Sequence, residues 1–106
     1  MNKVKVLLLS GCSHCDTLIK ELDILKIKYE SIDADDNSVL ADDVERLIKT
    51  STYPILILEQ PPITTFLFRA TDTPELGLNF IDHHMNRLGC ANVGAMVGFL
   101  QTLLKQ

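Results

Sequence analysis

Apolar residues in the first half of the chain alternate between short continuous runs and helically spaced positions. Residues 3–9 form an apolar run that a Ser-Gly pair follows, which predicts a buried strand. Over residues 13–26 the apolar side chains recur every three or four positions, which predicts an amphipathic helix. Residues 27–32 are rich in β-formers, so we interpret them as a second strand. Apolar positions at helical spacing return over residues 39–49 and predict a second helix.

A hairpin is predicted from the middle of the chain. Pro54 precedes an apolar run over residues 55–58, and residues 63–69 form another β-rich run. The segment Gln60-Pro61-Pro62 marks a turn between the two runs. We therefore expect two strands that pair with each other.

The last third of the chain divides into a weakly patterned segment and a helix. Residues 71–88 lack strong periodicity, although 79–87 could hold a short helix, and common strand-to-helix connections are shorter than this segment. We interpret residues 71–88 as an insertion outside the core of the fold. From Val93 onward the apolar positions recur at helical spacing, and Asn92 is a candidate N-cap.

The segment Cys12-Ser13-His14-Cys15 lies where the first strand gives way to the first helix. Two cysteines at this spacing can close a small disulfide ring, and the free amides and dipole of a helix N-terminus stabilise a thiolate there. His14 adds a titratable cation that favours the ionised form of Cys12. We predict that Cys12 attacks a disulfide sulfur and that Cys15 resolves the mixed disulfide.

Other interpretations of these residues remain open. The cysteine pair could be half of a zinc site or two inert small hydrophobic residues. His14 could be a solvated residue of the first helical turn. His83 and His84, with Asp82 and Cys90, invite a metal site alongside Cys12 and Cys15, but adjacent histidines point in different directions, so we expect no metal to be bound.

Length, composition and charge narrow the range of partners. The chain has 106 residues, of which 46% are hydrophobic, and no apolar run approaches the roughly 18 residues of a membrane span. We expect one domain over residues 1–106, in the cytoplasm and without a membrane partner. Three cysteines cannot all pair within the chain, so a secreted disulfide scaffold is not indicated. A net charge of −4 argues against nucleic acid as a partner.

Three local motifs make the chain similar to the glutaredoxin branch of the thioredoxin-like superfamily. They are Gly11-Cys12-Ser13-His14-Cys15 after a buried strand, Thr52-Tyr53-Pro54 before an apolar strand, and Leu88-Gly89-Cys90-Ala91-Asn92 before the last helix. The resemblance implies an α/β fold of order βαβαββα, with a central four-stranded mixed sheet flanked by helices. Here residues 71–88 would be inserted before the last helix, where we expect them to rim the active site.

The resemblance also implies a substrate site around the cysteines. A cis bond before Pro54 would turn the backbone of Tyr53 towards the cysteines, where it could pair with an extended substrate such as glutathione or a client protein. One substrate carboxylate would sit at the amides from Cys90 to Asn92, at a helix N-terminus. Lys49 could add a second charge contact. The side chain of Tyr53 could be core or pocket wall.

Cys90 has two interpretations. It is either a buried small residue or a third thiol near the glutathione pocket, open to glutathionylation.

The resemblance implies a dithiol oxidoreductase that reduces protein or glutathione mixed disulfides. We expect a monomer without a bound cofactor, with glutathione as the reductant and disulfide-bearing proteins as clients. The alternatives are a thioredoxin-like carrier or thiol oxidant independent of glutathione, and a metal-binding or structural module of the same fold.

Overall fold

The computed structural model describes residues 2–70 and 77–105. Within these ranges the elements follow in the order β1 (Lys3–Leu8), α1 (Ser13–Ile24), β2 (Glu30–Asp33), α2 (Ser38–Ile48), β3 (Ile55–Gln60), β4 (Ile63–Arg69), β5 (Gly77–Asp82), β6 (Met85–Cys90) and α3 (Val93–Leu104). The hydrophobic pattern predicted β1, α1 and α2 to within two residues at each end, and it predicted the start of α3 at Val93.

The strand β2 begins three residues later than predicted because the chain first completes the C-terminal turn of α1. Lys26 adopts a left-handed backbone with a φ of 58°. The amide of Ile27 then donates to the carbonyl of Leu22 at 3.0 Å, which satisfies one of the free carbonyls of the last helical turn.

The described strands form one mixed sheet of six strands in the order β2-β1-β3-β4-β6-β5. β1 pairs with β2 in parallel and with β3 in antiparallel orientation, and β3 forms the predicted hairpin with β4. β6 runs parallel to β4, and β5 returns antiparallel along its outer side. The sheet thus brings the end of β4 beside the end of β6, just before α3 begins.

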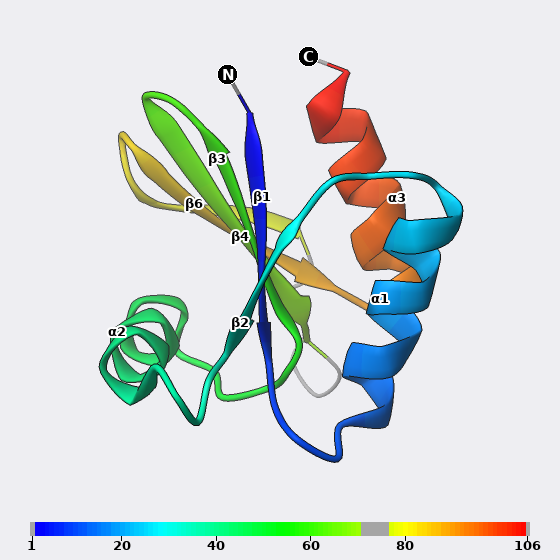
Figure 1. The fold of residues 1–106 in the computed structure, drawn as a ribbon. Coiled ribbons are helices and arrows are strands. Elements are labelled where there is room, and N and C mark those ends of the chain that lie inside the picture. Colours follow the sequence, from blue (N-terminus) through cyan, green and yellow to red (C-terminus); the bar gives the residue numbers. More distant parts are fainter. Residues whose placement is uncertain (1, 71–76, 106) are drawn as a thin grey trace.

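Helices cover both faces of this sheet. α1 and α3 lie on one face, and α2 lies on the other (Figure 1). Each face has its own apolar cluster, because successive side chains of a strand point to opposite faces: Val4 and Val6 lie in one cluster and Leu7 in the other. The removal of these side chains from water is the main driving force for folding.

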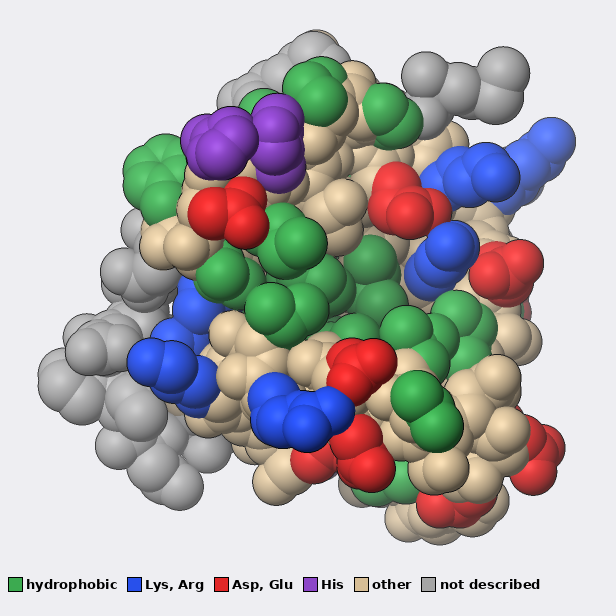
Figure 2. All heavy atoms as spheres, turned by 90° about the vertical axis from the view of Figure 1, so that its left-hand side faces the viewer, with side chains coloured by type: hydrophobic (Ala, Val, Ile, Leu, Met, Phe, Trp, Pro, Cys, Tyr) green, Lys and Arg blue, Asp and Glu red, His purple; other side chains and the backbone are tan. Residues whose placement is uncertain are grey.

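The face that carries α2 is less fully covered than the opposite face. Figure 2 shows hydrophobic side chains gathered at the centre of this face, below the paired histidines and among charged side chains. Leu40 and Leu47 of α2 are among its exposed apolar residues. In the part of the chain that the structure describes, α2 is the only helix over this face.

The prediction of a four-stranded sheet is wrong in strand number, because the supposed insertion supplies β5 and β6. Residues 79–87 form a hairpin rather than a helix, and its turn lies at the opposite end of the sheet from the start of α1 (Figure 1). Leu88 is only 6% exposed and lies in the cluster under α3. The segment from residue 77 onward therefore belongs to the core sheet, while residues 71–76 lie outside the described residues.

The weak periodicity of this segment has a physical reason. β5 is an edge strand, and a strand at an edge is under less constraint to alternate apolar and polar side chains. In β6 the first three residues, from Met85 to Arg87, are only half-buried. The apolar pattern that indicates a strand is therefore confined to the buried C-terminal end of β6.

Candidate active site

The two cysteines of the motif form a disulfide at the N-terminus of α1. Their Cα atoms are 5.2 Å apart. Cys12 is the N-cap residue, with an extended backbone, and its Sγ accepts a hydrogen bond from the amide of Cys15 at 3.1 Å. Gly11 precedes it with a φ of +72°, a conformation that strains any residue with a Cβ. The turn after β1 thus places the first sulfur on the free amides of the helix.

The two sulfurs differ in exposure. Cys15 is 3% exposed and packs in the cluster on the α2 face, whereas Cys12 is half-buried and lies at its margin. A substrate can therefore approach the residue at position 12 more readily than the residue at position 15. His14 is exposed on the first turn of α1.

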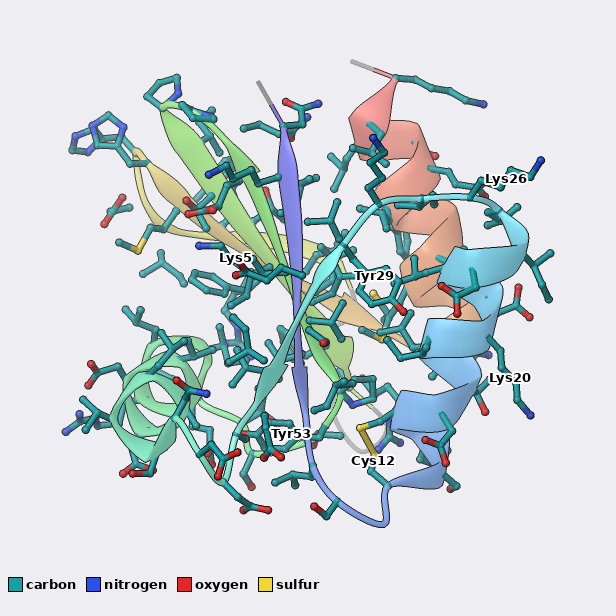
Figure 3. All side chains as sticks on the ribbon, in the orientation of Figure 1. Lys5, Cys12, Lys20, Lys26, Tyr29 and Tyr53 are labelled. Atoms are coloured by element: carbon teal, nitrogen blue, oxygen red, sulfur yellow. A yellow bond between two sulfur atoms is a disulfide. The ribbon has the colours of Figure 1, made fainter. Side chains whose placement is uncertain are left out.

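The peptide bond between Tyr53 and Pro54 is cis, as the resemblance implied. Tyr53 and Cys15 belong to the same buried cluster, and Figure 3 shows Tyr53 and the Cys12 disulfide at the same end of the molecule. The fold therefore places the Thr52-Tyr53-Pro54 motif near the cysteine motif.

The side chain of Tyr53 belongs to the core. It is 6% exposed, and its hydroxyl donates to Oε2 of Glu45 in α2 at 2.9 Å. Burial raises the pKa of the Tyr53 hydroxyl above its usual value, and the hydrogen bond to Glu45 and nearby negative charges raise it further. Of the two interpretations of this side chain, the core is confirmed.

This tyrosine leads to a stability prediction. We expect Tyr53→Phe to lower the free energy of unfolding at pH 7 by about 0.5–1.5 kcal/mol, because Glu45 loses its buried hydrogen-bond donor. The raised pKa means that the wild-type protein loses stability as the pH rises above ~10, where the unfolded tyrosine ionises first, and the variant should lose less.

Urea unfolding at pH 7 and at pH 10.5 measures both effects. The matched control is Tyr29→Phe, whose hydroxyl donates to Asp23 at the surface at 3.2 Å and whose loss should cost less. Equal losses in the two variants at pH 7 would contradict the core assignment of Tyr53.

Arg69 is a site residue that the sequence analysis did not identify. At the end of β4, its Nη2 donates to the carbonyl of Tyr53 at 2.9 Å. The parallel pairing of β4 with β6 also sets Arg69 opposite Cys90. The sequence feature that could have identified Arg69 is a charged residue at the end of an otherwise apolar strand. In the sheet, this strand lies next to the strand that Pro54 opens.

Cys90 is a buried residue rather than an accessible third thiol. Its side chain is 1% exposed, and its Sγ lies 3.6 Å from the carbonyl of Leu88. Burial raises the pKa of this thiol to about 12, although a backbone hydrogen bond at Phe68 opposes the shift. The interpretation that Cys90 is open to glutathionylation is wrong for this conformation, because a buried neutral thiol is a poor nucleophile.

Asn92 is the N-cap of α3, as predicted. Its Oδ1 accepts a hydrogen bond from the amide of Ala95 at 2.8 Å. The cap occupies the side chain of Asn92, so any substrate contact there would use the backbone amides at the start of α3.

Lys49 ends α2 in a left-handed conformation with an exposed side chain. The structure does not join it to the cysteines by a hydrogen bond or an ion pair among the described residues, and its contact with a substrate stays a prediction.

The prediction that the adjacent histidines point in different directions is wrong. The rings of His83 and His84 do not diverge, since their centroids are 4.1 Å apart. In the two described ranges, however, no three potential metal ligands gather in one place. The cysteines and the histidine pair are thus not assembled into a metal site among the described residues.

Comparison with known protein families gives one match. The family model described as Glutaredoxin matches residues 4–60, which is more than half of the chain. Searches of curated proteins and of solved structures found no match. The matched range contains the disulfide and the cis proline, whereas Arg69 and the start of α3 lie beyond it. None of the helices in the described ranges is long and apolar enough to span a membrane.

Proposed function

Since this chain belongs to the glutaredoxin family, we propose that it is a dithiol–disulfide oxidoreductase that reduces glutathione mixed disulfides and protein disulfides, with glutathione as its reductant. The observation that carries this proposal is the Cys12–Cys15 disulfide at the N-terminus of α1, with its first sulfur on a helix amide. A half-buried first sulfur beside a buried second one suits a redox role, in which a substrate reaches only the first.

The reaction begins with the reduced protein. The Cys12 thiolate attacks one sulfur of the substrate disulfide, a bond forms between these sulfurs, and the other substrate sulfur leaves as a thiolate that takes up a proton. Cys15 then loses its proton and attacks the Cys12 sulfur, which closes the internal disulfide and releases the second substrate thiol. Two electrons have passed from the dithiol to the substrate. Two glutathione thiols restore the dithiol and become oxidised glutathione.

The geometry supports the assignment of these roles. The amide of Cys15 that donates to the Cys12 sulfur in the disulfide can donate to the thiolate after reduction, and the N-terminus of the helix dipole favours the same charge. The burial of Cys15 lets it act only on a sulfur already bound to Cys12, as a resolving thiol does.

The backbone of Tyr53 is the proposed contact for an extended substrate. Its carbonyl already accepts a hydrogen bond from Arg69, which leaves one lone pair of that oxygen and the amide for a substrate. The start of α3 offers further amides to a substrate carboxylate. Lys49 is the proposed second charge contact to the substrate, and His14 is proposed to favour the Cys12 thiolate.

Equilibration in glutathione buffers tests the function. We expect the Cys12/Cys15 pair to exchange with glutathione and a Cys15→Ser variant to hold one glutathione on Cys12, visible by mass spectrometry. Exchange with a dithiol reductant but never with glutathione would contradict the choice of reductant and favour a thioredoxin-like carrier. Bound zinc in the purified reduced protein would favour the metal-binding alternative.

His14 gives a further prediction. We expect His14→Ala to raise the pKa of Cys12 and to make the disulfide harder to reduce, because the thiolate loses a nearby cation. A change of one pKa unit corresponds to about 1.4 kcal/mol, which is enough to shift the redox equilibrium by an order of magnitude. The pH dependence of alkylation and the equilibrium with glutathione measure the two effects. An unchanged equilibrium would leave His14 as a solvated bystander.

A further inference from the structure

Arg69 lies where the candidate site and the end of the sheet meet. Its Nη2 holds the carbonyl of Tyr53, beside the cis bond to Pro54, and its backbone pairs with β6 at Cys90, two residues before the cap of α3. Leu67, two residues earlier in β4, lies in the cluster under α1 and α3, so Arg69 points to the same face of the sheet. This is the face that α1 and α3 cover (Figure 1), whereas the disulfide at the start of α1 packs with Tyr53 against the cluster on the α2 face, so the contact with the Tyr53 carbonyl is what joins Arg69 to the site.

The charge of this arginine has no carboxylate partner among the described residues. The ion pairs in the described ranges are Lys5 with Glu59 and Arg46 with Asp43, and neither includes Arg69. The Arg69 side chain is half-buried, and its Nε is buried without a hydrogen-bond acceptor in residues 2–70 and 77–105. A half-buried cation without an anion is costly, so the arrangement suits a site that an anion enters.

We propose that Arg69 binds a carboxylate of the disulfide substrate and so gives the protein a preference for anionic over neutral disulfides. This inference rests on the proposed function and assigns the charge contact of that site to a residue of β4. A guanidinium carries five N–H donors in a planar fork, of which Tyr53 occupies one. The remaining donors can pair with a carboxylate in a bidentate manner, which a lysine cannot do.

Two small disulfides of similar length test the preference. One is 3,3′-dithiodipropionate, which carries two carboxylates, and the other is bis(2-hydroxyethyl) disulfide, which is neutral. The single-turnover rate constant for each is measured with the reduced protein, and the ratio of anionic to neutral rate constants is the readout. A role of Arg69 in structure alone would change both rates together and leave the ratio unchanged.

The matched control is Arg87 in the neighbouring strand β6. It too is half-buried with a buried Nε, but it lies on the α2 face, with its guanidinium carbon 4.9 Å from the centre of the Phe68 ring. We expect Arg69→Gln to lower the ratio about tenfold, which corresponds to ~1.4 kcal/mol. The ratio for Arg69→Lys should fall between those of the wild-type protein and Arg69→Gln, and Arg87→Gln should keep the wild-type ratio.

The outcomes separate the inference from the proposed function. An unchanged ratio in Arg69→Gln, with both disulfides reduced, overturns the inference and leaves the proposed function standing. No reduction of either disulfide by the wild-type protein overturns the proposed function and the inference with it.

If Arg69→Gln does not fold, the effect of added salt on the rate of the wild-type protein tests the inference instead. Attraction by Arg69 predicts that salt slows the anionic substrate, whereas the net charge of −4 alone predicts that salt accelerates it. Acceleration overturns the inference.

Discussion

Replacement of Cys12 with serine is expected to reduce the rate of disulfide reduction to that of the uncatalysed reaction, while Cys15→Ser stops the reaction after its first step. The reason is that the hydroxyl of serine is not ionised near neutral pH and cannot attack sulfur, whereas the loss of Cys15 removes only the resolving thiol. Cys15→Ser should therefore accumulate the mixed disulfide on Cys12.

Mass spectrometry after addition of oxidised glutathione measures the adduct in each variant. Cys90→Ala is the control, since its buried thiol takes no part in the proposed reaction and an adduct should still form and be resolved. An adduct in Cys12→Ser that maps to Cys15 would reverse the roles of the two cysteines. Alkylation of the reduced wild-type protein at pH 6 should label Cys12 before Cys15, because the helix N-terminus stabilises the Cys12 thiolate.

Excision of residues 71–88, with a short bridge in their place, is expected to abolish cooperative unfolding. The excision removes β5 and most of β6, and with them the hydrogen bonds along β4 and the side chain of Leu88 under α3. The stability of a domain is only about 5–15 kcal/mol, so the loss of two strands of its sheet is not tolerated. This prediction reverses the one that the weak periodicity of the segment would support.

Two single substitutions separate the core part of the hairpin from its surface part. Leu88→Ala should lower the free energy of unfolding by about 2–5 kcal/mol, because it leaves a cavity in the core. Phe80→Ala in the edge strand should change it by at most ~0.5 kcal/mol, since that ring is 75% exposed. Urea unfolding checks all three variants. A cooperative transition of normal stability in the excised protein would show that the hairpin is an accessory to the fold.

The sequence by itself determined the elements whose signals are local. A short apolar run predicts β1, helical spacing predicts α1 and α3, and Asn92 caps α3 through a hydrogen bond within its own first turn. The cysteine pair could be recognised for the same reason, because its chemistry depends on a helix N-terminus that begins at the motif itself. The cis bond before Pro54 followed from the resemblance, since composition around a proline does not specify the isomer.

Only the tertiary structure decided which strands complete the sheet and which side chains face the site. β6 is a strand because it pairs with β4 on one side and with β5 on the other, and its half-buried first residues carry little periodic signal. The burial of Cys90 and Tyr53 depends on α3 and α2 packing over them. The contact of Arg69 with Tyr53 joins residues 16 apart through the β3–β4 pairing, and its place opposite Cys90 depends on a parallel register across 21 residues. Local pattern does not encode such registers, because they arise from the way separate segments share one core.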